Sequence, residues 1–455
     1  MADLGVYIDQ NEKRYVDELV TLLKFPSVSA DSANAGDIDQ CADWLVDHLS
    51  GLGLTATKMA TGGHPVVYAE WLKAEGKPTV LIYGHYDVQP ADPLELWDSP
   101  PFDPVVKEGK LYARGSSDNK GQFYAHIKGI EAHLKQSGEL PVNVKLLIEG
   151  EEEVASAHLE DFIIDHKDML KADVVVVSDS AMAGPEMPAI TYGLRGLAYL
   201  EVRVDGPNRD LHSGSYGGSV ANPAEMLARM LTQCKDDSGR VLIPAFYDDV
   251  MEVGAQEREL LAKVPFDRDA DAESIGIPKH WGEEGYSVLE WRWARPTFEV
   301  NGIFGGYMGE GPKTVLPSWA GAKVSMRLVP NQDPDKIAAA FEHFIDHIKP
   351  DSVKVTVKRY DGAFPSVVAS EGPFVEAATR AVEKGFGTPP IFTREGGTIP
   401  VVSTFKKVLG LDTILIGYGQ NDDNLHSPNE KFTLKDYHRA VHTSAYLLTE
   451  LADAG

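Results

Sequence analysis

Two patterns of hydrophobic and polar residues divide the chain. Before about residue 191 and after about residue 366, short runs are almost wholly apolar: PVVYAEW, PTVLIYG, NVKLLIE, DVVVVS and DTILIGYG. Continuous apolar runs of this kind are typical of strands covered on both faces, so they predict a mostly parallel sheet of the α/β class. Apolar residues at helical spacing predict the helices on its two faces, at residues 4–23, 38–52, 119–136 and 373–385 and from Leu434 onward.

The middle of the chain follows a different pattern. GLAYLEVRVDG, TFEVNGIFGG, AGAKVSMRLVP and VKVTVKRY predict strands, and SVANPAEMLARMLTQC and DPDKIAAAFEHFIDHIK predict helices, in the order βαββαβ of a ferredoxin-like α+β unit. We therefore expect a discontinuous catalytic domain, residues 1–191 and 367–455, and an inserted lid or dimerisation domain, residues 192–366. Residues 235–296 form an acidic insertion with no clear pattern.

Charge and composition narrow the function. The chain of 455 residues has 43 basic and 69 acidic side chains and a net charge of −26, which disfavours a nucleic-acid partner. Its two cysteines, Cys41 and Cys234, suit a reducing compartment better than a disulfide framework. Neither a signal peptide nor an apolar stretch of membrane-spanning length is present, so we expect a cytoplasmic protein with no membrane partner.

Short motifs place metal-ligating side chains just beyond apolar runs. Imidazole nitrogen and carboxylate oxygen are ligands that borderline divalent cations accept, and one carboxylate can bridge two ions. The carboxyl ends of parallel strands meet at one edge of a sheet, so residues that follow different strands can converge there. The candidates are His85 and Asp87 in LIYGHYD, Asp118 in RGSSDNKG, Glu152 and Glu153 in IEGEEE, Asp179 in VVVVSDS and His426 in NDDNLHSPNE.

Each of these motifs also fits a structural role when taken alone. A histidine in a loop is usually polar surface, the Glu run fits a solvated helix start, and Asp179 fits an N-cap. The joint placement at strand ends favours a two-metal hydrolase, with Asp118 well placed to bridge. The segment from Ser117 to Lys120 also matches the S-x-x-K pattern of serine acylases, but clear partner motifs are missing.

The motifs in this order resemble the aminoacylase-type dinuclear metallopeptidases, in particular the carnosinase and Cys-Gly dipeptidase branch. The similarity covers nearly the whole chain and includes GHYDVQPA, WDSPPFDPVVKEGKLYARGSSDNKG, YGLRG, DLHSGSYGGSV, KTVLP and RLVPN. Strings of this length are far more specific than the ligand pattern. The resemblance implies two divalent cations per subunit, Zn²⁺ or Mn²⁺, and a homodimer.

The resemblance also implies a role for each candidate residue. One cation would be bound by His85, Asp118 and Asp179, and the other by Asp118, Glu153 and His426. Glu152 would be the general base, with Glu151 as the fallback because the register of the triple Glu is ambiguous, and Asp87 would orient His85. The partner subunit would supply His212 to stabilise the oxyanion, and the substrate carboxylate would be bound by Thr314, Arg327 and Thr398, the last of which is Ser in some relatives.

We therefore expect a metal-dependent dipeptidase that hydrolyses dipeptides or short peptides through a metal-activated water. The first alternative is an N-acyl-amino-acid deacylase or another amidase on the same metal centre. The second is a catalytically silent dimer that binds metal or an amino acid. The retention of Glu152, Asp87 and His212 argues against the silent dimer.

Overall fold

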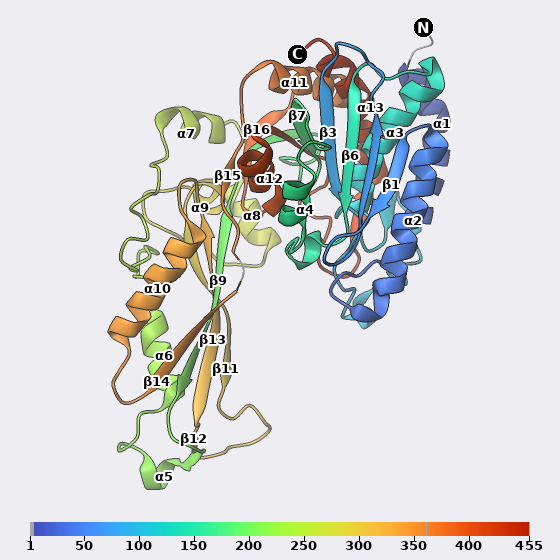
Figure 1. The fold of residues 1–455 in the computed structure, drawn as a ribbon. Helices are drawn as coiled ribbons and strands as arrows, with labels where there is room; N and C mark the ends of the chain where they lie inside the picture. The colour runs from blue at the N-terminus through green and yellow to red at the C-terminus, as the bar shows by residue number, and fades with distance from the viewer. Residues whose placement is uncertain (1–3, 361, 455) are drawn as a thin grey trace.

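The apolar runs of the first and last parts of the chain form one nine-stranded sheet in the computed structural model, which describes residues 4–360 and 362–454 (Figure 1). The order is β1-β2-β6-β3-β7-β17-β8-β15, and β16 also pairs with β8. The strands are β1 (Thr55–Met59), β2 (Val66–Trp71), β3 (Thr79–His85), β6 (Asn143–Glu149), β7 (Val174–Val177), β8 (Ala189–Leu194), β15 (Ser366–Val367), β16 (Ile391–Glu395) and β17 (Thr413–Gly417).

The α/β class is confirmed, although the sheet is mixed rather than mostly parallel. Strands β6, β3, β7 and β17 are parallel neighbours, whereas β1, β2 and β15 run antiparallel to their neighbours. Strand β8 pairs antiparallel with β17 and parallel with β16. The parallel centre is the part that the apolar runs predict, because only strands covered on both faces need such composition.

Helices cover both faces of this sheet. One core cluster joins one face of the sheet to the five longer helices of this lobe, and a second cluster joins the other face to two shorter helices. The longer helices are α1 (Leu4–Leu23), α2 (Ala35–Leu52), α3 (Lys120–Ser137), α11 (Pro373–Phe386) and α13 (Leu434–Leu451), and the shorter ones are α4 (Leu159–Asp165) and α12 (Pro400–Thr404). A small sheet of β4 (Val105–Lys107), β5 (Lys110–Tyr112) and β18 (Lys431–Thr433) lies beside them.

The middle of the chain forms a second lobe around a four-stranded antiparallel sheet with the order β11-β13-β9-β14. Its elements follow the predicted order βαββαβ: β9 (Gly196–Asp205), α6 (Pro223–Thr232), β11 (Thr297–Gly305), β13 (Trp319–Leu328), α10 (Pro334–Ile348) and β14 (Lys354–Arg359). Both helices pack on one face of the sheet. The far end of this lobe carries the short strands β10 (Leu211–His212) and β12 (Val315–Leu316) and helix α5 (Ser213–Tyr216) (Figure 1).

The acidic insertion, which the sequence left without an assignment, contains three short helices. They are α7 (Ala255–Leu261), α8 (Arg268–Ser274) and α9 (Val288–Trp293). A salt bridge of 2.7 Å joins Glu257 of α7 to Arg394 of β16. The insertion therefore starts from the four-stranded lobe and packs against the edge of the nine-stranded sheet.

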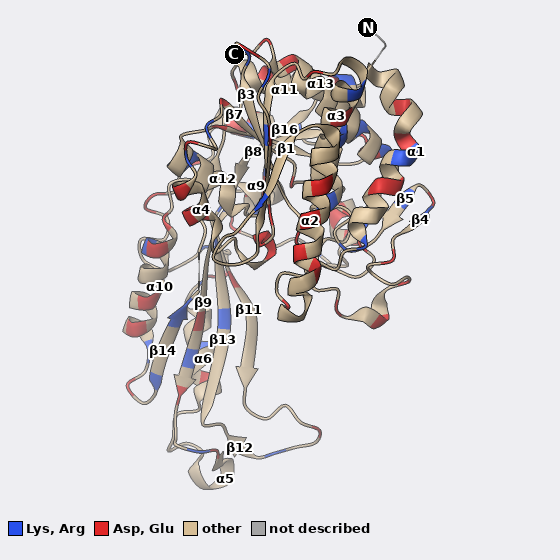
Figure 2. Cartoon of the chain, turned by 45° about the vertical axis from the view of Figure 1, so that its right-hand side comes forward, with Lys and Arg blue, Asp and Glu red and all other residues tan. Residues whose placement is uncertain are grey.

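The surface agrees with the acidic composition. Acidic residues are spread over α1, α2 and α10 rather than gathered at one place (Figure 2). Within residues 4–360 and 362–454, no helix is both long enough and apolar enough to pass through a membrane.

Candidate metal centre

The five predicted ligands come from five separate segments. His85 is the last residue of β3, Asp118 precedes α3, Glu153 follows β6, Asp179 follows β7, and His426 lies in the loop between β17 and β18. Because β3, β6, β7 and β17 are parallel neighbours, their carboxyl ends meet at one edge of the sheet. The topology therefore brings together side chains that are far apart in sequence.

Asp118 lies between two groups of ligand atoms. Its Oδ1 is 3.3 Å from Nε2 of His85, which is also 3.7 Å from Oδ1 of Asp179. Its Oδ2 is 2.9 Å from Nε2 of His426, which is also 3.3 Å from Oε2 of Glu153. The two groups thus share one carboxylate, which is the arrangement that a bridging ligand requires.

The donor set fits two divalent cations. In each group the potential ligand atoms lie within 4.8 Å of one another. The Nε2 atom of His85 is buried and has no hydrogen-bond partner within the described part of the chain, although carboxylate oxygens surround it. Buried polar atoms are normally satisfied, so this nitrogen is aimed at a group that is not part of the protein.

A third cluster of similar composition, Glu18, His48 and Glu131, does not form a comparable site. The ammonium of Lys128 is 2.8 Å from Oε2 of Glu131 and also pairs with Glu18, and Arg14 pairs with both carboxylates. Cationic side chains already balance these acids. The cluster is therefore a salt-bridge network between α1 and α3, with His48 of α2 beside it, 3.1 Å from the ammonium of Lys128.

Asp87 fixes the loop that carries the ligands. Its Oδ1 is 3.4 Å from Nδ1 of His85, on the side of the ring opposite the other ligands. Its carboxylate also accepts hydrogen bonds from the backbone N–H groups of Glu152 (3.2 Å) and Glu153 (3.1 Å). The buried carboxylate of Asp87 thus lies against the ring of the predicted ligand His85, whose Nδ1 is also 3.2 Å from the backbone carbonyl of Asp87, and it holds the segment after β6.

Three further supporting residues were not singled out from the sequence. Gln89 donates to Oε2 of Glu153 (2.8 Å), and Asn119 donates to Oδ1 of Asp179 (2.9 Å). Glu430 accepts a hydrogen bond of 3.1 Å from the backbone N–H of Asp118. Gln89 and Asn119 lie one or two residues from predicted site residues, and this short separation was the feature of the sequence that could have identified them. Glu430 is the last residue of the motif NDDNLHSPNE, but nothing in that motif indicates a contact with Asp118.

The structure distinguishes the three consecutive glutamates. Glu151 is held by His158, whose Nδ1 is 2.8 Å from its carboxylate. Glu153 lies in the second ligand group. The carboxylate of Glu152 forms no hydrogen bond or ion pair with any described residue, and burial together with the charges of Asp179, Glu153 and Asp118 raises its pKa well above the usual value.

Burial alone would also raise the pKa of Asp118, but hydrogen bonds to His426 and His85 lower it.

A further carboxylate, Glu395, lies near this centre at the end of β16. Burial raises its pKa to about 8, and the charges of Asp179 and Asp118 act in the same direction, while a hydrogen bond from the backbone of Ala181 opposes them. This residue was not singled out from the sequence.

The predicted substrate-binding residues lie in two places. Nη1 of Arg327 donates to Oγ1 of Thr398 (3.0 Å), where the four-stranded lobe meets the nine-stranded one. His212 and Thr314 lie together at the far end of the four-stranded lobe, where the N–H of Ser213 donates to the carbonyl of Thr314 (3.0 Å). This end, marked by α5 and β12, is remote from the ligand edge of the same chain (Figure 1).

Comparison with known proteins shows the family of this chain. The family model described as peptidase family M20/M25/M40 matches residues 81–450, and the chain belongs to this family. It is 34% identical to the Cys-Gly metallodipeptidase of Candida albicans, over 94% of this chain and 93% of the relative. It is also 34% identical to the Beta-Ala-His dipeptidase of Homo sapiens, over 85% and 78%. The resemblance inferred from the motifs is confirmed.

Solved structures are also similar to this chain over nearly its whole length. Human carnosine dipeptidase 1 matches with a TM-score of 0.87 at 31% identity, over 99% of this chain and 98% of that one. An M20 family metallo-carboxypeptidase from Sulfolobus solfataricus matches with a TM-score of 0.87 at 36% identity, over 96% and 99%.

Proposed function

We propose that this protein is a metal-dependent dipeptidase. The observation that carries the proposal is the pair of ligand groups that share Asp118, with the unpaired carboxylate of Glu152 beside them. The names of the relatives, which describe Cys-Gly and Beta-Ala-His dipeptidases, support dipeptides as the substrate class. The metals are Zn²⁺ or Mn²⁺, since imidazole and carboxylate ligands accept both.

The chain's own residues would divide the chemistry as follows. Cations held by His85, Asp118 and Asp179 and by Asp118, Glu153 and His426 would supply Lewis acidity, which lowers the pKa of water and polarises a carbonyl. Glu152 would accept the proton of the attacking water at its carboxylate and then deliver it to the leaving amine nitrogen. Asp87 would keep the imidazole of His85 oriented, and Arg327 with Thr398 would hold the carboxylate of the substrate.

We further propose a homodimer in which each subunit completes the active site of the other. The division into a catalytic domain (residues 1–191 and 367–455) and a lid domain (residues 192–366) belongs to this proposal. The distance in Figure 1 between the end that carries His212 and Thr314 and the ligand edge of the same chain supports action in trans. Exposed apolar side chains on and after the edge strand β11, at Ile303 and Met308, support a contact surface on this lobe. His212 would stabilise the oxyanion.

Two less favoured functions would rely on the same metal-site residues as the proposed dipeptidase. An N-acyl-amino-acid deacylase would share the metal centre and base, because pocket residues rather than the metals decide the substrate. A silent metal-binding dimer would have no need of an unpaired Glu152 beside the ligands. A cytoplasmic location is supported by the two cysteines, which are buried and free.

Hydrolysis by metal-stripped protein reloaded with Zn²⁺ or Mn²⁺ tests the proposal. The substrates are Cys-Gly, β-Ala-His, Ala-Leu, a tripeptide and an N-acetyl amino acid. We expect metal-dependent cleavage of the dipeptides, and the more active ion identifies the cation. Cleavage of the acetylated substrate alone would indicate a deacylase, and removal of the last residue from the tripeptide would indicate a carboxypeptidase. No cleavage despite full metal content would contradict an enzymatic function.

A further inference from the structure

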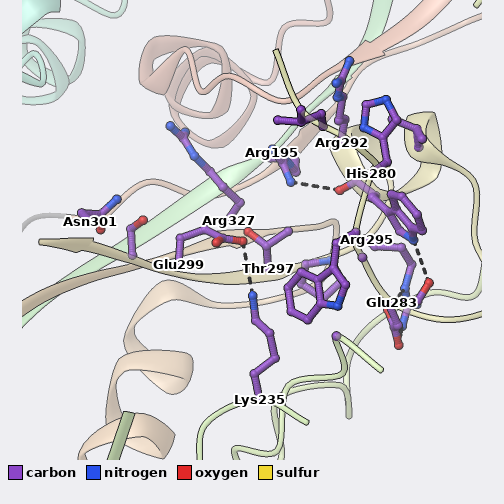
Figure 3. A pocket seen from close by; sticks show the side chains of 18 residues that line it. Arg195, Lys235, His280, Glu283, Arg292, Arg295, Thr297, Glu299, Asn301 and Arg327 are labelled. Carbon is purple, nitrogen blue, oxygen red and sulfur yellow. Dashed lines mark hydrogen bonds and ion pairs between the residues drawn. The ribbon is translucent and has the colours of Figure 1, made fainter. Parts of the chain in front are cut away.

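A cavity of about 510 Å³ lies between the insertion and the four-stranded sheet. Figure 3 shows Arg195 and Arg327 at this cavity, with Glu299 between Arg327 and Lys235. Trp281 and Trp291 also line it. The cavity is therefore rich in cationic and aromatic side chains, although the protein as a whole is strongly acidic.

Most of the charges around this cavity neutralise one another. Arg295 forms two hydrogen bonds of 2.8 and 2.9 Å with Glu283. Arg292 forms two hydrogen bonds of 2.9 and 2.7 Å with Asp271. Lys235 pairs with Glu299 at 3.5 Å. The guanidinium groups of Arg195 and Arg327 take part in none of these bonds.

Arg195 and Arg327 form no ion pair with any acid among the described residues, and both are half-buried. Arg195 donates to two neutral carbonyl oxygens, those of Gly396 (3.2 Å) and Trp291 (3.3 Å). Arg327 donates to the hydroxyl of Thr398. Burial and the nearby charge of Arg327 lower the pKa of Arg195 to about 10, although the charge of Glu299 acts in the opposite direction. Glu299 already pairs with Lys235, so two neighbouring guanidinium groups without an ion-pair partner of their own favour the binding of anions.

The segment at residues 395–398 runs from the neighbourhood of the metal centre to the two arginines. Glu395 lies within the electrostatic reach of Asp179. One residue later, the carbonyl of Gly396 accepts from Arg195, and the hydroxyl of Thr398 meets Arg327. A dipeptide whose scissile bond lies at the metal centre and whose carboxylate lies at Arg327 would thus direct the side chain of its C-terminal residue towards Arg195.

We propose that Arg195 is a specificity-determining residue that binds a second carboxylate, so that the enzyme prefers dipeptides whose C-terminal residue is Asp or Glu. This inference rests on the proposed dipeptidase function. Arg327 and Thr398 would take the α-carboxylate, which leaves Arg195 as the one guanidinium of the pair still to be balanced. Both arginines line the cavity, and its volume of about 510 Å³ is large enough for an acidic side chain.

Alanyl-glutamate and alanyl-glutamine differ in one charge and hardly in shape, so the ratio of their kcat/KM values tests the inference. We expect a preference for alanyl-glutamate of at least about tenfold in the wild-type enzyme, which falls as salt is added because ions screen the attraction. Arg195→Gln should bring the ratio close to one, whereas Arg195→Lys should keep part of it. The matched control is Arg292→Gln, which removes a cavity guanidinium already paired with Asp271 and should leave the wild-type ratio unchanged.

A second measurement needs no variant and covers the case in which Arg195→Gln does not fold. L-Glutamate should bind the wild-type protein at least about tenfold more tightly than L-glutamine, measured by calorimetry or as product inhibition. Equal affinities, or a wild-type kcat/KM ratio near one, would overturn the inference and leave the dipeptidase proposal intact. Failure to cleave any dipeptide would instead overturn the proposed function, and the two affinities would still decide whether the cavity selects a second carboxylate.

Discussion

At the scale of single residues, the sequence predicted which candidate ligands lie together, but it did not predict the contacts around them. His85, Asp118, Glu153, Asp179 and His426 were identified because metals accept few ligand types and because strands end at a common edge. The register of the triple Glu came from family resemblance alone. In the structure, His158 holds the carboxylate of one of the three, and such a contact depends on tertiary packing that sequence patterns do not contain.

Replacing Glu152 by Gln tests whether this residue acts as the general base or binds a metal. The amide has the shape of the carboxylate but cannot accept a proton from water, so kcat should fall by roughly 10²–10⁴-fold. Metal content, measured by elemental analysis after dialysis, should stay at the wild-type level. The matched variant is Glu153→Gln, which removes a carboxylate from the second ligand group and should lose metal as well as turnover. Equal metal loss in both variants would mean that Glu152 is itself a ligand.

At the scale of elements, buried strands were the easiest to predict and the insertion the hardest. The apolar runs matched β2, β3, β6, β7 and β17 closely, since burial on both faces leaves little choice of residue. Strands β15 and β16 are short and carry a mixed composition, so periodicity could not identify them. Helices α7, α8 and α9 have six or seven residues each, too few to show a helical pattern.

Helix α3 is an unusual element because it is buried along most of its length and still carries polar residues. His126, in its middle, is 2% exposed. Its Nε2 is 2.8 Å from the hydroxyl of Ser178 and its Nδ1 is 3.0 Å from that of Ser444. Neutral hydroxyls do not compensate a buried positive charge, and burial lowers the pKa of His126 to about 4.

The lowered pKa of His126 predicts a loss of stability in acid. The unfolded chain binds a proton below its ordinary pKa of about 6.5, whereas the folded protein resists it until about pH 4. The contribution of His126 to the free energy of unfolding is therefore complete above pH 6.5, decreases as the pH falls, and is lost at about pH 4. The total is roughly 3 kcal/mol.

Urea denaturation between pH 4 and 8 measures this effect. The free energy of unfolding should fall less steeply in His126→Gln than in the wild type, because glutamine has no proton to gain. Release of metal in acid affects both proteins, so the difference between their slopes isolates His126. Parallel slopes would show that His126 does not contribute to acid sensitivity.

At the scale of the whole molecule, the order of strands and helices in the four-stranded lobe could be predicted from the sequence, but the position of His212 and Thr314 could not. The order βαββαβ followed from alternating patterns, and the four-stranded sheet has it. Nothing in those patterns indicates that His212 and Thr314 lie at the end of their lobe, far from the ligand edge of the same chain (Figure 1). Action of these residues in the partner's active site came from resemblance, and it remains a prediction.

Mixing two inactive variants tests action in trans. His212→Ala keeps its metal ligands, and Asp118→Ala keeps its lid, so a heterodimer of the two contains one complete active site and one that lacks both groups. If subunits exchange at random, half of the dimers are mixed, and activity should recover to about a quarter of the wild-type value. Turnover of a dipeptide after co-refolding, with differently tagged subunits to isolate the mixed dimer, measures this recovery.

The control pairs two lid variants, His212→Ala and Thr314→Ala. Every site of that mixed dimer would still receive one damaged lid, so exchange should restore no activity beyond that of the two parents. Recovery with Asp118→Ala but not with Thr314→Ala requires that the metal ligands and His212 of one working site belong to different chains. If the isolated heterodimer with Asp118→Ala stays inactive, His212 acts on the metal centre of its own chain, and the lobe that carries it must swing towards that centre during catalysis.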